Sequence, residues 1–153
     1  MADDIQKEDI DPWFVTWKLG DQFLDTVRTY AEEINLGAGT TIFSAGDASD
    51  AMYLVLEGMV LVLTHDENGQ EHTVSIISEG QSFGEIGLLV KQPHSATTAA
   101  GMDVRLLKIT ETSLKKLEDA KPEIMMQIYK VLATSLAEQW MMVTQSNRGS
   151  QTE

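Results

Sequence analysis

The stretch with the most evident chemistry is FGEIGLLVKQPHSAT, residues 83–97, called the cassette below. It begins with an aromatic residue, a glycine and an acid, continues with a short apolar run, and ends on Pro, His, Ser, Ala and Thr. This pattern is typical of a loop that wraps a sugar and a phosphate. Such a loop usually ends on a fixed positive charge, and that place holds His94. The residue types alone leave open whether the cassette is a ligand site or only the framework of one.

The segment before the cassette, residues 37–83, has the composition of short strands joined by tight turns. Asn68-Gly69 lies between two apolar runs and predicts a two-residue hairpin, because both positions of that turn need φ > 0. One or two further strands are expected within residues 97–109. Short strands at near-regular spacing predict a β-sandwich or a jelly-roll barrel. Turn signals stand at Gly37-Ala38-Gly39, Gly46-Asp47, Glu57-Gly58, Asn68-Gly69 and Glu79-Gly80.

Two helices are predicted after the strands. Thr110 is a candidate N-cap for a short helix, and Pro122 suits the first turn of the next one. Residues 123–145 then run for about six turns without Gly or Pro. This helix carries two apolar stripes, of which one can cover the barrel and the other needs a partner helix. A homodimer through residues 122–144 is therefore expected. The stripes are Ile124, Ile128 and Val131, and Met125, Leu132, Leu136, Trp140 and Val143.

The N-terminal residues divide into an acidic arm and the start of a domain. Residues 1–12 are acidic, and the two Trp of PWFVTWKL indicate a packed anchor segment. Residues 21–33 have apolar side chains at helical spacing and could also run into a first strand. The predicted limits are an arm over residues 1–19, one domain with its C-terminal helices over residues 20–146, and a polar tail over residues 147–153.

Composition excludes several classes of function. The chain has 153 residues, 42% of them hydrophobic, which is enough for one folded domain. It has no cysteine, so disulfides, thiolate metal sites and cysteine nucleophiles are excluded. The net charge is −13 and no segment is basic, so we expect no binding to nucleic acid. No signal peptide and no run of membrane-spanning length is evident, and we expect a cytoplasmic protein without a membrane partner.

Catalysis and metal binding lack support in the residues. Jelly-roll metal enzymes need a His-x-His pair with a nearby acid, and His65, His72 and His94 form no such pair. A nucleophile-elbow pattern is also absent from the sequence. We expect a protein that is not an enzyme and that has no metal or cofactor.

On these residues the chain resembles the cyclic nucleotide-binding domain family over residues 20–145. The resemblance rests on IFSAGDASDAMYLVLEGMVLVL, on Glu79-Gly80 and on Phe83-Gly84-Glu85 with the helices that follow. It implies a mainly β fold with flanking helices: a double-stranded β-helix (jelly-roll) barrel with a short cassette helix and C-terminal helices. It also implies a non-catalytic regulatory domain with cyclic AMP or cyclic GMP as possible ligand.

The resemblance also implies a set of site residues. Gly84 and Glu85 would meet the ribose, with the carboxylate accepting a hydrogen bond from the 2′-hydroxyl. The N–H groups at the start of the cassette helix would face the cyclic phosphate, as helix N-termini suit anions. The full set is Phe83, Gly84, Glu85 and Ile86; Gly87 and Leu88 at the helix start; His94; Ser95 and Ala96 as the other side of the phosphate cradle; and Gln139 and Trp140 against the purine.

The chain departs from the family at His94, where the pattern has an arginine. Arginine is always charged and offers a planar fork to phosphate oxygens, whereas histidine is shorter and mostly neutral at cytosolic pH. Lys91, three positions earlier, could lend a point charge. The exchange predicts weakened cyclic nucleotide binding with an unchanged fold.

Two functional hypotheses follow. The first is a stand-alone sensor domain that binds cyclic nucleotide weakly, or a related small anionic ligand, and signals to a protein partner as a dimer. The alternative is a degenerate fold that acts only as a protein–protein interaction module. DNA-binding relatives continue into a helix-turn-helix module, whereas this sequence ends at Glu153. We therefore expect no complete transcription factor of that kind.

Overall fold

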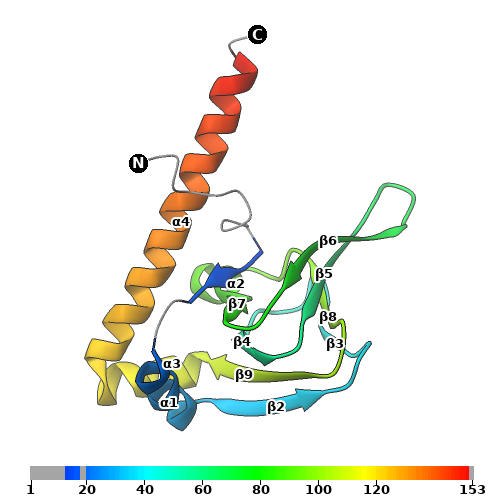
Figure 1. Ribbon diagram of the computed structural model, residues 1–153. Coiled ribbons are helices and arrows are strands. Elements are labelled where there is room, and N and C mark those ends of the chain that lie inside the picture. Colours follow the sequence, from blue (N-terminus) through cyan, green and yellow to red (C-terminus); the bar gives the residue numbers. More distant parts are fainter. Residues whose placement is uncertain (1–12, 18–19, 152–153) are drawn as a thin grey trace.

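The computed structural model describes residues 13–17 and 20–151, with side chains up to residue 145. Its strands form two antiparallel sheets, and α1, α3 and α4 gather at one side of them (Figure 1). The strands are β1 (Val15–Thr16), β2 (Glu32–Leu36), β3 (Thr41–Phe43), β4 (Ala51–Glu57), β5 (Val60–His65), β6 (Glu71–Ile77), β7 (Gln81–Phe83), β8 (Thr97–Ala100) and β9 (Val104–Thr110). The helices are α1 (Asp21–Tyr30), α2 (Glu85–Val90), α3 (Glu111–Ala120) and α4 (Pro122–Gln151).

The predicted fold class, mainly β with flanking helices and of the jelly-roll type, is confirmed. The five-stranded sheet has the order β1-β7-β4-β9-β2, and the four-stranded sheet has the order β3-β8-β5-β6. Among the residues described, the strands thus form two hydrogen-bonded sheets rather than one closed barrel. The cassette begins at the end of β7, next to β4, and returns to the other sheet as β8.

Strand β4 shows how the layers are built, because it is buried on both faces. Ala51, Tyr53 and Val55 belong to the core shared by the two sheets. Met52 and Leu54 belong to a second core, which the five-stranded sheet shares with α1, α3 and α4. Successive side chains of a strand point to opposite faces, so a strand covered on both sides is almost entirely apolar. The run AMYLVL therefore gives the cassette a rigid neighbour.

The β5–β6 hairpin was predicted correctly, but its turn was not. The loop spans residues 66–70, and only Gly69 in it has a positive φ, of 80°. The Asp66 side chain accepts hydrogen bonds of 2.9 Å from the backbone N–H groups of Asn68 and Gln70. These bonds stabilise a longer turn than the two-residue type. The hairpin projects from the body of the molecule (Figure 1).

Part of the predicted N-terminal arm belongs to the folded body. Phe14 and Val15 are buried, and Val15 lies opposite Ser82 in the β1–β7 pair. Residues 1–12 and 18–19 lie outside the described residues. The predicted helix and strand after them are present as α1 and β2. The N-terminal segment is thus the outermost strand beside the cassette.

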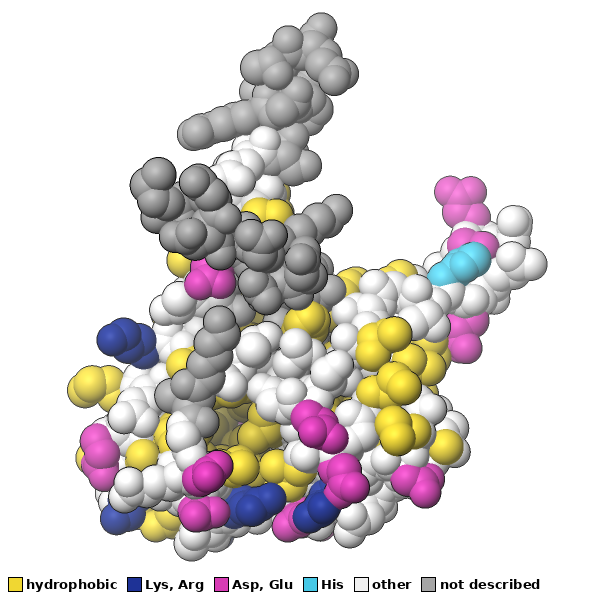
Figure 2. Space-filling view, viewed as in Figure 1, with side chains coloured by type: hydrophobic (Ala, Val, Ile, Leu, Met, Phe, Trp, Pro, Cys, Tyr) yellow, Lys and Arg dark blue, Asp and Glu magenta, His cyan; other side chains and the backbone are white. Residues whose placement is uncertain are grey.

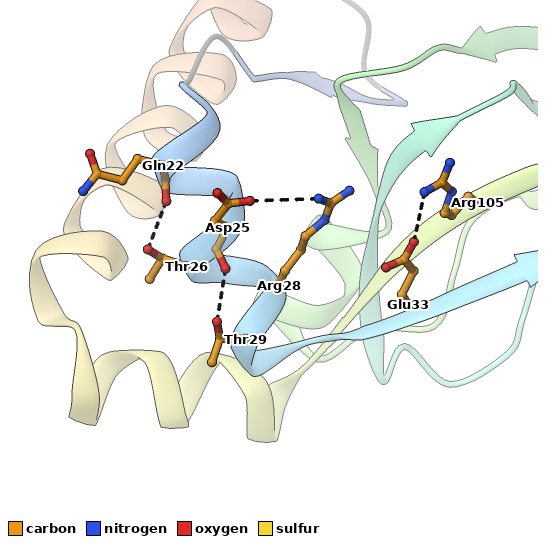
Figure 3. A network of polar contacts seen from close by, with 7 residues as sticks. All are labelled: Gln22, Asp25, Thr26, Arg28, Thr29, Glu33 and Arg105. Carbon is orange, nitrogen blue, oxygen red and sulfur yellow. Dashed lines mark hydrogen bonds and ion pairs between the residues drawn. The ribbon is translucent and has the colours of Figure 1, made fainter.

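Local polar contacts lie within α1 and, separately, between β2 and β9 (Figure 3). Within α1, the Thr26 hydroxyl donates to the Gln22 carbonyl at 3.0 Å, and Arg28 pairs with Asp25 at 4.0 Å. Arg105 on β9 pairs with Glu33 on β2 at 3.4 Å. Exposed ion pairs contribute little to stability, so the apolar core rather than these contacts holds the layers together.

The last two helices begin as predicted, and the second extends further than predicted. The Thr110 hydroxyl accepts a hydrogen bond of 3.1 Å from the Ser113 N–H, which confirms the N-cap. Helix α4 continues to Gln151, beyond the boundary predicted at 146, and its C-terminal half projects past the sheets (Figure 1). Among the described residues no helix is both long and apolar enough to cross a membrane.

Candidate ligand pocket

The cassette turns sharply before its helix. Phe83 ends β7 and is buried, and Gly84 follows with φ 85°, in the left-handed region that favours glycine. A Cβ at Gly84 would lie 3.2 Å from the Ala51 carbonyl oxygen. Helix α2 then runs for six residues and ends at Lys91, which also has a positive φ, of 58°. The cassette is therefore a tight excursion between the two sheets.

Gly87 lets α2 approach the neighbouring loop closely. A Cβ at Gly87 would lie 2.6 Å from Ser49 Oγ and 2.9 Å from the Gln92 carbonyl oxygen. Gly87→Ala is expected to destabilise the protein by about 1–3 kcal/mol, because backbone must move to admit the methyl group. The measurement is urea denaturation. Gly37→Ala is the control, since its Cβ would meet only Asp103 Oδ1 at 3.8 Å and should change stability by less than about 0.5 kcal/mol. Equal effects of the two changes would contradict the close approach.

A pocket of about 440 Å³ lies against the cassette, between α2 and β8. The structure brings eight of the predicted site residues together around it. They are Phe83, Gly84, Glu85, Ile86, Gly87, His94, Ser95 and Ala96. The pocket is here called the cassette pocket.

Three predicted site residues do not line the cassette pocket. Leu88 is buried in the core beneath the helices, on the other side of α2. Gln139 lies beside a small cavity between α2 and α4. Trp140 is 68% exposed on α4. The two residues predicted to meet a purine therefore stand outside the pocket in this chain.

The pocket also has walls that the residue pattern did not indicate. Trp13 reaches it from the segment before β1, Phe43 from β3, and Val62 and Thr98 from the four-stranded sheet; Val90, Gln92 and Pro93 complete the lining. Trp13 was recognised only as part of a packed anchor. Pairing of β1 with β7 places that anchor beside the cassette, and no local signal in the sequence specifies this pairing.

Glu85 is the first residue of α2 and is 4% exposed. Burial raises the pKa of its carboxyl group to about 8, although hydrogen bonds from its own backbone amide and with Ser82 act in the opposite direction. Ser82 Oγ also accepts a hydrogen bond of 2.6 Å from Trp17 Nε1. Glu85 Oε2 has no hydrogen-bond partner among the described residues. At neutral pH the group is mostly protonated, so it can donate as well as accept a hydrogen bond.

His94 is held by backbone and by stacking. Its backbone N–H donates a hydrogen bond of 3.0 Å to the Asp47 carbonyl, and its backbone carbonyl accepts one of 2.8 Å from the Gly46 N–H. The imidazole lies flat on Phe43, with ring centroids 3.5 Å apart and planes 7° apart. Burial lowers the pKa of His94, against the opposing effect of the Asp50 and Asp47 carboxylates. The ring is therefore mostly neutral near pH 7 and supplies no fixed charge to the pocket.

The described lining of the cassette pocket contains neither Lys nor Arg. Lys91, the nearby base named from the sequence, pairs with Glu111 on α3 instead. The site can thus offer backbone donors, a buried carboxylic acid, hydroxyl groups and aromatic rings. These groups can hold a ligand by hydrogen bonds and by ring stacking.

The family model described as cyclic nucleotide-binding domain matches residues 33–120, which include β4, the cassette and α3. The chain belongs to the cyclic nucleotide-binding domain family. Within this family it is 30% identical over 105 residues, 69% of its length, to lysophospholipase NTE1 of Chaetomium globosum, of which it spans 7%. It is 32% identical over 98 residues, 63% of its length, to the cAMP-activated global transcriptional regulator CRP of Pasteurella multocida, of which it spans 47%.

Two solved structures of bacterial proteins have the same fold. The catabolite activator protein of Thermus thermophilus matches with a TM-score of 0.71 and 28% identity, over 85% of this chain and 61% of that one. The N-terminal domain of a transcriptional regulator from Streptomyces coelicolor matches with a TM-score of 0.70 and 27% identity, over 79% and 86%. The chain is thus similar to part of a transcriptional regulator and to a small part of a much longer lysophospholipase.

Proposed function

We propose that this chain is a regulatory domain that binds a small ligand in the cassette pocket. The effect of ligand binding is transmitted to α4. The observation that carries the proposal is the position of Glu85. Its side chain lines the cassette pocket and also a small cavity against α4, beside Leu132, Leu136 and Gln139. A ligand that engages Glu85 therefore acts on the contact between α2 and α4.

Cyclic nucleotides are weak ligands of the cassette pocket in this proposal. The fold, the glycine turn and Glu85 are retained, so the sugar and part of the phosphate can be held. What is missing is a fixed positive charge, because His94 is neutral and Lys91 is engaged elsewhere. A protein of this kind signals by binding, and no catalytic step is proposed for it.

Helix α4 supports a homodimer, with a second copy of the chain as the partner. Its core face is formed by Met125, Ile128 and Leu132. A separate stripe on α4 is exposed and repeats with spacings of three and four residues, as in a coiled coil. It consists of Met126, Tyr129, Ala133, Leu136, Trp140 and Val143. The apolar residues of α4 therefore fall into other groups than the two predicted stripes. Met125 and Leu132 of the second predicted stripe face the core, whereas its members Leu136, Trp140 and Val143 do not.

Leu136→Glu is expected to weaken the dimer at least about tenfold, because a charge would be buried between two apolar helices. Thr134→Glu is the control, since two residues along a helix is a rotation of about 200° and places Thr134 away from the stripe. Sedimentation velocity over a range of protein concentrations measures both variants. A monomeric unmodified protein at high concentration, or equal effects of the two changes, would refute pairing through this stripe.

A thermal-shift screen combined with light scattering tests the proposed function. The ligands are cyclic AMP, cyclic GMP, cyclic dinucleotides and their uncharged nucleosides. The proposal expects that at least one of them stabilises the protein and changes the affinity of the α4 dimer. The absence of Lys and Arg from the described pocket lining favours a second candidate, an interaction module without ligand. That candidate takes first place if no small molecule shifts the melting temperature.

A further inference from the structure

The cassette pocket carries an inference about its ligand class, which rests on the proposed function because it concerns the same site. Two of the lining residues each have a buried side-chain oxygen that lacks a hydrogen-bond partner among the described residues: Glu85 Oε2 and Thr98 Oγ1. The residues are 4% and 3% exposed. Buried polar groups in folded proteins are almost always hydrogen-bonded, and each exception needs an explanation, such as a bound water, ion or ligand. Two residues with such oxygens line one pocket, and a ligand there that reaches both oxygens would supply the missing hydrogen bonds.

The hydrogen-bonding character of the two groups restricts the ligand. A Thr hydroxyl donates and accepts, and a protonated carboxylic acid does the same. Burial raises the Glu85 pKa to about 8, which keeps the acid protonated near neutral pH. A ligand that carries both donors and acceptors, such as a heterocyclic amide or an aminopyrimidine, can hydrogen-bond to both groups without any charge.

The lining of the pocket includes four residues with aromatic rings. Trp13, Phe43, Phe83 and His94 all line it, and the His94 ring is stacked on Phe43. Aromatic faces favour planar rings through offset stacking and through the apolar area that they bury. The volume of about 440 Å³ lies within the range of about 300–1,000 Å³ that small-molecule pockets have.

The electrostatics of the pocket disfavour an anion. Its described lining contains no Lys or Arg, and the carboxylates of Asp47 and Asp50 act on His94 from nearby. Moving a phosphate from water into such a site removes its hydration without supplying a countercharge. An uncharged ligand avoids this cost.

We propose that the cassette pocket binds an uncharged planar heteroaromatic compound, of nucleobase or nucleoside size, between its aromatic walls and hydrogen-bonded to Glu85 and Thr98. The preference among nucleotide-like molecules is therefore the reverse of a phosphate-binding site: the nucleoside binds better than its cyclic phosphate. Trp13, from the N-terminal segment of the same chain, forms part of the pocket wall.

Calorimetric titration of the full chain with adenosine and with cyclic AMP at pH 7 tests the inference. Adenosine is expected to bind at least about tenfold more tightly than cyclic AMP. Thr98→Val should weaken adenosine binding about fivefold, through loss of one hydrogen bond. Thr73→Val, on the exposed side of β6, should leave it unchanged. Glu85→Gln keeps a donor and an acceptor and should retain binding, whereas Glu85→Leu should lose it.

The outcomes separate this inference from the proposed function. The uncharged ligand class is overturned if cyclic AMP binds as tightly as adenosine. It is also overturned if Thr98→Val and Glu85→Leu leave adenosine binding intact. Both results still agree with the proposed ligand-responsive domain. Absence of adenosine binding also overturns it. Adenosine binding that does not change the α4 dimer supports the ligand class but contradicts the proposed signalling.

Discussion

His94→Arg is expected to strengthen cyclic AMP binding about a hundredfold and to reverse the preference between cyclic AMP and adenosine. Hydrogen bonds to charged groups contribute about 1.5–3 kcal/mol each, and about 1.4 kcal/mol is a tenfold change in affinity. An Arg side chain can keep the stacking on Phe43 and add a bidentate contact to phosphate oxygens. The backbone bonds of His94 to the loop at residues 46–47 do not depend on its side chain, so the cassette should keep its path.

Two further variants make the His94→Arg result interpretable. His94→Gln removes the imidazole without adding charge and should leave cyclic AMP binding weak. Asp50, whose carboxylate acts on His94, could engage the new guanidinium, so His94→Arg is also combined with Asp50→Asn. Calorimetry measures each protein. If neither the single nor the double variant gains affinity for cyclic AMP, the site lacks more than one charge and the interaction module without ligand is favoured.

Glu85→Gln is expected to remove a large part of the pH dependence of stability. The ordinary pKa of a glutamate is 4.5, and in the folded protein burial raises the Glu85 pKa to about 8. Between these values the native state holds a proton that the unfolded state has lost. The native protein therefore loses about 1.4 kcal/mol of stability for each unit by which the pH rises through this window. The contribution is complete below pH 4.5 and is lost once the pH reaches about 8.

A Gln side chain resembles the protonated acid and does not titrate, so the variant should be the more stable protein at pH 8 and nearly equal to the unmodified one at pH 5. Urea denaturation at both pH values measures the difference. Glu118→Gln on the exposed side of α3 serves as control and should leave the pH dependence unaltered. Parallel stability curves for Glu85→Gln and the unmodified protein would show that Glu85 is ionised in the fold.

The order of elements and most of the pocket were predictable because they depend on local signals. Glycines with positive φ in predicted turns, as at Gly58 and Gly80, and an N-cap at Thr110 are specified by the residues themselves. The apolar run of β4 shows a strand covered on both faces. The family resemblance added a set of candidate site residues, and eight of them line one pocket.

The remaining features depend on contacts between distant parts of the chain. Trp13 lines the pocket because β1 pairs with β7, and Thr98 does so because β8 belongs to the facing sheet. The longer β5–β6 turn depends on the Asp66 side chain, which competes with the Asn-Gly signal. Trp140 stands outside the pocket because α4 runs straight past the sheets, and periodicity alone does not give the direction of a helix.

The surface also carries apolar area that the proposals do not use. Val74 and Ile76 on β6, the edge strand of the four-stranded sheet, are 44% and 52% exposed, and Figure 2 shows hydrophobic side chains gathered near β5 and β6. Acidic side chains are spread over the same view. Charged residues near an exposed edge strand disfavour edge-to-edge association, which agrees with the net charge of −13.

We infer that this cyclic nucleotide-binding fold has a pocket without the positive charge that would hold a phosphate. The most direct test is calorimetric titration of cyclic AMP into the unmodified protein, at physiological salt and at two pH values. The expected dissociation constant at pH 7.5 is about 0.1 mM or weaker. If the His94 ring faces the phosphate, affinity should rise as the pH falls through the histidine's titration range, because the protonated ring gains a charge. Tight binding of cyclic AMP that is independent of pH would contradict the assignment of His94 as the missing charge.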